Sequence, residues 1–183
     1  MQNSEYSDGH WRRLNLPHDW AIEGDFSPSN PSGASGGALP GGIGWYRKHF
    51  SLSPDEKYDR FTITFDGVYM NSTVYINGHK LGTRPYGYST FEYDLTPYIY
   101  KKGDNVIAVK VDNSDQPNSR WYSGCGIYRH VWLTKTLKEA YIPQWGQYVA
   151  TTPKGDVRVK VDFHAEGSRM KLSIRNTIYD AAG

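Results

Sequence analysis

The loop at residues 112–129, which reads DNSDQPNSRWYSGCGIYR, holds the densest group of side chains that could do chemistry. Asp112 and Asp115 are two carboxylates close in sequence, and hydrolysis of a glycosidic bond needs a carboxylate pair. One of the two would have to stay protonated in an apolar site. This loop is polar and carries Arg120, which favours ionised carboxylates. A general-acid role is therefore poorly supported.

The same loop suits binding better than bond cleavage. Carboxylate and amide groups, as in Asp112 and Asn113, exchange hydrogen bonds with hydroxyl groups. Trp121 and Tyr122 have rings of the kind that cover the apolar face of a sugar. A structural interpretation is also open, in which Arg120 pairs with a carboxylate to lock the turn and Trp121 is a hydrophobic plug.

Other chemistries find little support in the residues. His18 and Asp19 are neighbours in LPHDW, which favours a turn whose polar groups bond nearby backbone. Cys125 is the only cysteine and is flanked by glycines without an evident base, so we expect a small buried residue. No two histidines have metal-ligand spacing, and no phosphate-binding loop is present. We therefore expect no metal site and no cofactor.

Composition excludes further classes of protein. The chain has 183 residues and a net charge of +2, with acidic and basic residues interspersed, so nucleic acid is not an expected partner. Apolar runs are only a few residues long, so we expect no membrane span. The start, MQNSEYSDGHW, lacks the pattern of a signal peptide. Aromatic residues make up 15%, a content that suits strands and sugar-stacking faces.

The elements that must position the loop are predicted to be strands. Alternating apolar and polar residues, separated by turn residues, predict an antiparallel β-sandwich with strands in the segments 45–52, 60–68, 72–82, 89–99, 105–113 and 127–135, of which the strand in 89–99 stops near Pro97. Asn77-Gly78 divides one of these segments into a hairpin. Residues 28–42 are nearly all Pro, Gly, Ser, Asn and Ala, which predicts a long surface loop.

A domain boundary is predicted between Leu137 and Trp145. Three further strand-like runs follow it, at 147–153, 156–166 and 169–180. Three strands are few for a closed sandwich. We therefore expect the opening part of a second β-domain.

Six motifs, in this order, resemble the amino-terminal sugar-binding domain of glycoside hydrolase family 2, in its β-galactosidase-like branch. They are LPHDWAIE, GIGWYRKHF, VYINGHKLG, GYSTFEYDLTPYI, GDNVIAVKVDN and SRWYSGCGIYRHVWL. Each is weak alone, whereas six in the same order from Leu16 to Leu133 form a specific signal. The resemblance implies an all-β fold, with a jelly-roll (galactose-binding-like) β-sandwich followed by a partial immunoglobulin-like β-sandwich.

The resemblance also implies boundaries and missing parts. Residues 1–137 would be the jelly-roll sugar-binding domain, with its first strand missing, and 138–183 the N-terminal part of the immunoglobulin-like domain. The family's two catalytic glutamates lie in a (β/α)8 barrel, and neither motif occurs here. We therefore expect a non-catalytic region that is inactive alone and has the barrel of the same polypeptide as its partner.

In the family, the loop after the GDNVIAVKVDN strand helps to bind the terminal β-linked sugar. The resemblance thus makes Asp112, Asn113 and Asp115 candidate hydroxyl ligands, with Arg120 fixing the loop. Trp121 and Tyr122 would shape the wall. Periplasmic or extracellular localisation in a bacterium is expected by family habit. Two alternatives remain: a free-standing carbohydrate-binding module, and a structural β-sandwich that only docks partner domains.

Overall fold

The computed structural model describes residues 1–167 and 171–180. Within these residues the structure has strands and three short 3-10 helices but no α-helix, which confirms the predicted all-β class. None of the described helices has the length and apolar character needed to cross a membrane. The chain divides into two compact units, Met1–Lys135 and Thr136–Gly183.

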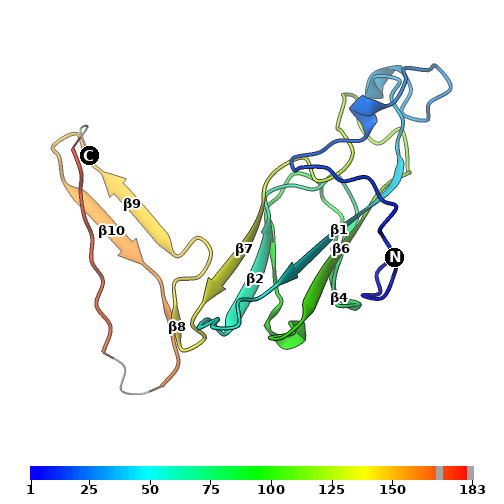
Figure 1. The fold of residues 1–183 in the computed structure, drawn as a ribbon. Coiled ribbons are helices and arrows are strands. Elements are labelled where there is room, and N and C mark those ends of the chain that lie inside the picture. The colour runs from blue at the N-terminus through cyan, green and yellow to red at the C-terminus, as the bar shows by residue number, and fades with distance from the viewer. Residues whose placement is uncertain (168–170, 181–183) are drawn as a thin grey trace. The chain divides into compact units, whose positions relative to one another are not determined.

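The first unit is a sandwich of two sheets (Figure 1). The four-stranded sheet consists, in spatial order, of β1 (Gly42–Ser51), β6 (Asp104–Asn113), β3 (Ser72–Ile76) and β4 (His79–Arg84). The three-stranded sheet consists of β5 (Phe91–Asp94), β2 (Arg60–Phe65) and β7 (Val131–Thr136). Pairing is antiparallel between β1 and β6, β6 and β3, β3 and β4, and β2 and β5.

The core lies between the two sheets and follows the predicted alternation. Phe61, Ile63 and Phe65 of β2 are almost completely buried and pack against inward side chains of β3, β5 and β6. The threonines that alternate with them are buried as well, with Thr62 only 1% exposed. Thr64 donates its hydroxyl hydrogen bond to Glu92 at 3.1 Å. Both faces of β2 are therefore covered, although its sequence reads as a strand with one polar face.

The hairpin predicted at Asn77-Gly78 is confirmed. Both residues have positive φ angles, 50° and 83°, as the tightest hairpin turns require. The Asn77 side chain accepts a hydrogen bond from the Val106 amide at 2.8 Å and donates one to the Asn105 side chain at 2.9 Å. The turn between β3 and β4 is thus tied to the start of β6.

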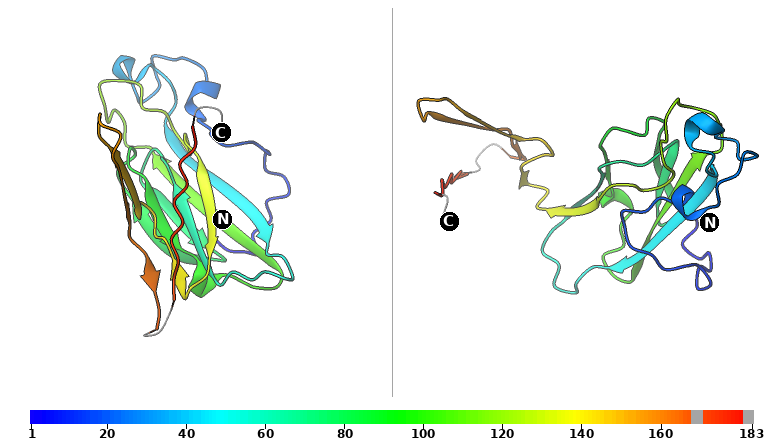
Figure 2. Two further views of the ribbon diagram at one scale, coloured as in Figure 1. Left: turned by 90° about the vertical axis from the view of Figure 1, so that its left-hand side faces the viewer. Right: turned by 90° about the horizontal axis from the view of Figure 1, so that it is seen from above.

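Long loops gather at one end of this sandwich. Figures 1 and 2 show the segment with η1 (Ala21–Glu23) and η2 (Ala34–Gly36) beside the yellow-green loop that follows β6. A third 3-10 helix, η3 (Thr96–Tyr98), follows β5 and contains Pro97, near which the strand was predicted to stop. Residues 1–41 contain no strand, so β1 is the first strand of the chain.

The second unit contains two small antiparallel sheets. One pairs β9 (Gln147–Thr151) with β10 (Val157–Val161), and the other pairs β8 (Ala140–Tyr141) with β11 (His164–Ala165). Strand β8 was not predicted. The strand predicted at 169–180 is wrong for residues 171–180, which have no regular structure. Residues 169 and 170 lie outside the described residues. Val149 and Val157 are exposed, because two-stranded sheets bury little surface. The immunoglobulin-like identity of the second unit and the domain boundary at 137/138 stay predictions.

Candidate functional site

The candidate loop leaves the end of β6, where consecutive side chains point to opposite faces of the sheet. Asp112 has a partly exposed side chain, whereas Asn113 is 1% exposed on the core side. Asp112 and Asn113, two of the three candidate hydroxyl ligands, therefore do not converge on one point, because strand geometry separates neighbouring residues.

The Asn113 side chain is engaged by the protein on all sides. Its Nδ2 donates to the carbonyl of Gly124 at 3.0 Å and lies 3.0 Å from the Cys125 sulfur. Its Oδ1 accepts a hydrogen bond from Asn118 at 2.7 Å. Asn118 also donates to the carbonyl of Asp115 at 3.0 Å. In this arrangement Asn113 ties the two ends of the loop together, and a sugar would reach it only if the loop opened; its ligand role stays a prediction.

Asp112 has the geometry of an ionised hydrogen-bond acceptor. Its carboxylate accepts the Ser114 hydroxyl at 2.6 Å and contacts the Lys110 ammonium at 2.9 Å. The Ser114 hydrogen bond, followed by Lys110, holds the pKa of Asp112 below its usual range. The carboxylate thus stays charged at neutral pH and is unsuited to donating a proton. We expected Arg120 to provide this charge, but Lys110 provides it.

The two rings of the loop are exposed and held by their polar edges. Trp121 is 60% exposed, and its indole N–H donates to the Tyr88 hydroxyl at 3.1 Å. Tyr88 packs edge-on against Tyr69, with ring centroids 5.2 Å apart. The Tyr122 hydroxyl donates to Asp19, and desolvation followed by this hydrogen bond raises the pKa of Tyr122. Both rings are therefore oriented while their faces stay accessible.

Asp19 is the residue that fixes the far side of the loop. One of its oxygens accepts hydrogen bonds from the backbone amides of Ala21 at 2.9 Å and Cys125 at 2.8 Å, and the other accepts the Tyr122 hydroxyl. The backbone beside it pairs with the loop, because Trp20 donates its amide to the Cys125 carbonyl at 3.0 Å. The bond to Ala21 is the nearby backbone contact that the sequence predicts for the LPHDW turn, and the support that this turn gives to the loop was not predicted.

The glycine-rich loop at 28–42 packs against this support. Leu39 is buried in a small cluster with Ala21 and Cys125. The adjoining pocket, lined in part by Asn113 and Tyr122, has a volume of about 10 Å³. This is room for about one water molecule, so this pocket is not a sugar subsite.

The remaining predicted residues lie at the surface. Asp115 and Arg120 are exposed. Within the described part of the chain, Arg120 has no hydrogen bond or ion pair, so Asn118 rather than Arg120 holds the loop. The habit of Asn of bonding to nearby backbone could have identified Asn118. No local signal could identify Asp19, which lies 106 residues before its partner Cys125.

The structure offers little for metal or thiol chemistry. Among the described residues, no group of three or more His, Cys, Asp or Glu side chains could hold a metal ion. Burial raises the pKa of the Cys125 thiol to about 11 and the side chain is 2% exposed, so a thiolate nucleophile is disfavoured. The loop therefore offers carboxylate acceptors, Asp112 and Asp115, and two exposed rings rather than a metal or a nucleophile.

Comparison with known proteins identifies the family. The model of the glycosyl hydrolases family 2 sugar binding domain matches residues 38–137, more than half of the chain. The chain belongs to glycoside hydrolase family 2. The match covers all seven described strands of the sandwich, β1 to β7, and the candidate loop, so the resemblance inferred from six motifs is confirmed.

Bacterial glycosidases are relatives of this family 2 chain. It is 63% identical over 147 residues to a β-galactosidase of Bacteroides ovatus, covering 80% of this chain and 17% of that protein. It is 35% identical over 147 residues to a β-glucuronidase of Formosa agariphila, covering 72% of this chain and 15% of that protein. The chain thus spans about a sixth of the length of these relatives.

A solved structure supports the same relationship. A β-glycosidase from Bacteroides vulgatus superposes with a TM-score of 0.84 at 42% sequence identity, covering 92% of this chain and 22% of that protein. At this similarity the fold of the family 2 chain is shared with the matching part of that enzyme.

Proposed function

We propose that this chain is a non-catalytic, amino-terminal, sugar-binding region of a β-galactosidase-like family 2 glycoside hydrolase acting in carbohydrate metabolism. The observation that carries the proposal is the 63% identity to the Bacteroides ovatus β-galactosidase, together with the family match over residues 38–137. Catalysis belongs, in this proposal, to the (β/α)8 barrel of the same polypeptide, outside these 183 residues. The substrate class is a terminal β-linked sugar, and the whole protein acts in the bacterial periplasm or outside the cell.

The candidate loop supplies the substrate contacts in this proposal. Asp112 accepts hydrogen bonds from sugar hydroxyls, because its carboxylate is ionised and 27% exposed. Trp121 and Tyr122 form a wall along one side of the substrate, since their rings are exposed and their polar edges are already bonded. Contacts of this kind orient a substrate for groups that react elsewhere.

The test uses the full-length protein and its isolated amino-terminal region. In the full-length protein, Asp112→Ala should lower kcat/KM for a β-galactoside by about a hundredfold with folding unchanged. Asp25→Ala, an exposed carboxylate outside the loop, is the matched control. The 183-residue chain alone should show no turnover of a chromogenic β-galactoside. An unchanged kcat/KM in Asp112→Ala would favour a purely structural domain, and enzyme-like turnover by the short chain would overturn the proposal.

A carbohydrate-binding module is the second candidate function, favoured by the exposure of Trp121 and Tyr122. It requires saturable binding of sugar by the 183-residue chain. Calorimetric titration with galactose separates the two functions, because the first needs the barrel to complete the site and the second does not.

A further inference from the structure

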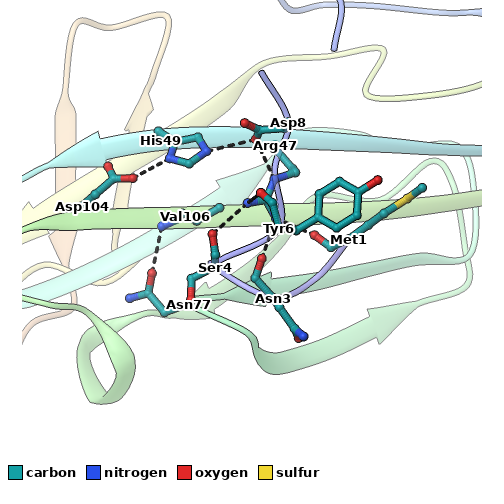
Figure 3. Close-up of polar contacts among 10 residues, drawn as sticks. All are labelled: Met1, Asn3, Ser4, Tyr6, Asp8, Arg47, His49, Asn77, Asp104 and Val106. Carbon is teal, nitrogen blue, oxygen red and sulfur yellow. Dashed lines mark hydrogen bonds and ion pairs between the residues drawn. The ribbon is translucent and has the colours of Figure 1, made fainter. Parts of the chain in front are cut away.

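The first eight residues cross the outer face of the four-stranded sheet, opposite the core (Figure 3). Arg47 and His49 of β1 are paired in register with Ala108 and Val106 of β6, so all four share this face. Ala108 and Val106 are 0% and 3% exposed although neither belongs to the core cluster. We call Met1–Asp8 the strap, because it covers this part of the sheet.

Arg47 binds the strap through its whole guanidinium group. The Arg47 side chain is 1% exposed, and its Nε donates to the Asp8 carboxylate at 2.7 Å. The other guanidinium nitrogens donate to four backbone carbonyls of the strap, those of Met1 (2.5 Å), Asn3 (3.0 Å), Ser4 (3.2 Å) and Tyr6 (3.3 Å). A buried cation is tolerated only when it is paired and its donors are satisfied. The strap therefore satisfies this arginine.

His49 lies between two carboxylates at the end of the strap. Its Nε2 is 3.0 Å from Asp8 of the strap, and its Nδ1 is 2.5 Å from Asp104 of β6. Only the doubly protonated imidazolium can donate to both carboxylates at once. The charged groups around it are Asp104, Asp8 and, behind Asp8, Arg47. Figure 3 shows these groups in one line along the sheet face.

We propose that Met1–Asp8 is a pH-dependent strap, which closes over the outer sheet face when His49 is charged and loosens when His49 becomes neutral. A neutral imidazole has one N–H, so one of the two carboxylates loses its donor. The remaining proton stays on Nδ1, beside the stronger partner Asp104, so Asp8 is then held by Arg47 alone. Loosening frees the end of the strap from the outer sheet face, where Arg47 and His49 lie.

The sign of the pH dependence follows from the two titrations. The hydrogen bonds to Asp104 and then Asp8 raise the pKa of His49, so its contribution is present below the usual histidine pKa and is lost as pH rises through the raised value. The Arg47 hydrogen bond lowers the pKa of Asp8, so Asp8 stays charged until strongly acidic pH. The strap is therefore tightest in the mildly acidic range and loosens toward alkaline pH.

Hydrogen exchange of the 183-residue chain tests the proposal. Protection factors of the Tyr6 amide, which donates to the Asn3 carbonyl at 3.2 Å within the strap, are measured from about pH 5 to about pH 9; these factors remove the intrinsic pH dependence of exchange. We expect them to fall several-fold through the His49 titration, because one unit of pKa difference is about tenfold in an equilibrium constant. In His49→Gln the strap should lose this pH dependence. His130→Gln, an exposed histidine outside the cluster, should keep it.

A second variant distinguishes His49 from a global effect of pH. Asp104→Asn removes the stronger of the two partners of His49, so the midpoint of the strap transition should move to lower pH, together with the His49 ring signals in an NMR titration. If protection of the strap in the unchanged chain does not depend on pH, or if the transition stays intact in His49→Gln, the proposal is overturned.

Discussion

Removing the Asp19 carboxylate should open the candidate loop and expose Cys125. In Asp19→Ala, the amides of Ala21 and Cys125 and the hydroxyl of Tyr122 lose their acceptor. Hydrogen bonds to a charged group contribute about 1.5–3 kcal/mol each, and these donors are partly buried, so we expect local opening to become easier by about 2–3 kcal/mol. At about 1.4 kcal/mol per factor of ten, this is roughly a 30- to 150-fold increase in the open population.

The chain contains its own reporter of this opening. Cys125 is the only cysteine and is 2% exposed, so a disulfide reagent reacts with it only after the loop opens. The rate of labelling in native buffer at fixed pH should rise by the factor given above in Asp19→Ala. Asp94→Ala is the matched control, because Asp94 also accepts a backbone amide, that of Thr96 at 2.8 Å, away from the cysteine.

Equal labelling rates in the two variants, with circular dichroism showing both folded, would refute this account. Asp19 would then be an ordinary surface turn residue. Faster labelling in Asp19→Ala without a matching loss in the urea midpoint would show that the opening is confined to the loop.

Three further predictions concern the loop and the core. Asn113→Ala should lower the free energy of unfolding in urea by about 2–3 kcal/mol, because it removes the side-chain donor of the buried Gly124 carbonyl; a loss under about 0.5 kcal/mol, typical of surface positions, would contradict its structural role. Ser114→Ala should raise the pKa of Asp112 toward its usual value in a carboxyl NMR titration, and the stability that Asp112 contributes at neutral pH should then disappear at a higher pH on acidification; an unchanged pKa would assign the shift to other groups. Phe61→Ala should cost about 3–5 kcal/mol in urea, since the side chain is 0% exposed in the core; a smaller cost would mean that the sandwich collapses around the cavity.

Much of the fold was predictable because its signals are local. Alternation at Phe61, Ile63 and Phe65 reflects the two faces of a strand. The dipeptide Asn77-Gly78 predicts a tight hairpin turn, because both residues tolerate positive φ angles. Strand prediction failed in short segments whose residues show no strong alternation. The strand at Ala140–Tyr141 has only two residues, and its existence depends on its partner His164–Ala165 later in the chain.

The candidate loop follows β6, as the order of the motifs predicts, but the surroundings of its residues were only partly predictable. Residue types identified the carboxylate and the rings. They could not distinguish the partly exposed Asp112 from the buried Asn113, because the direction of a side chain depends on which face of the sheet meets the core. The residues that support the loop, Asp19 and Tyr88, are distant from it in sequence, and no sequence pattern indicates this role.

By itself, the sequence determined the all-β class, the order of the main strands, the hairpin and the family, since these depend on residue patterns that are read along the chain. Only the tertiary structure decided that Asn113 ties the loop, that Asp19 supports it and that Arg47 and His49 bind the strap. The physical reason is that hydrogen bonds and burial depend on distances in space. Folding brings residues such as Asp19 and Cys125 together across 106 positions of sequence.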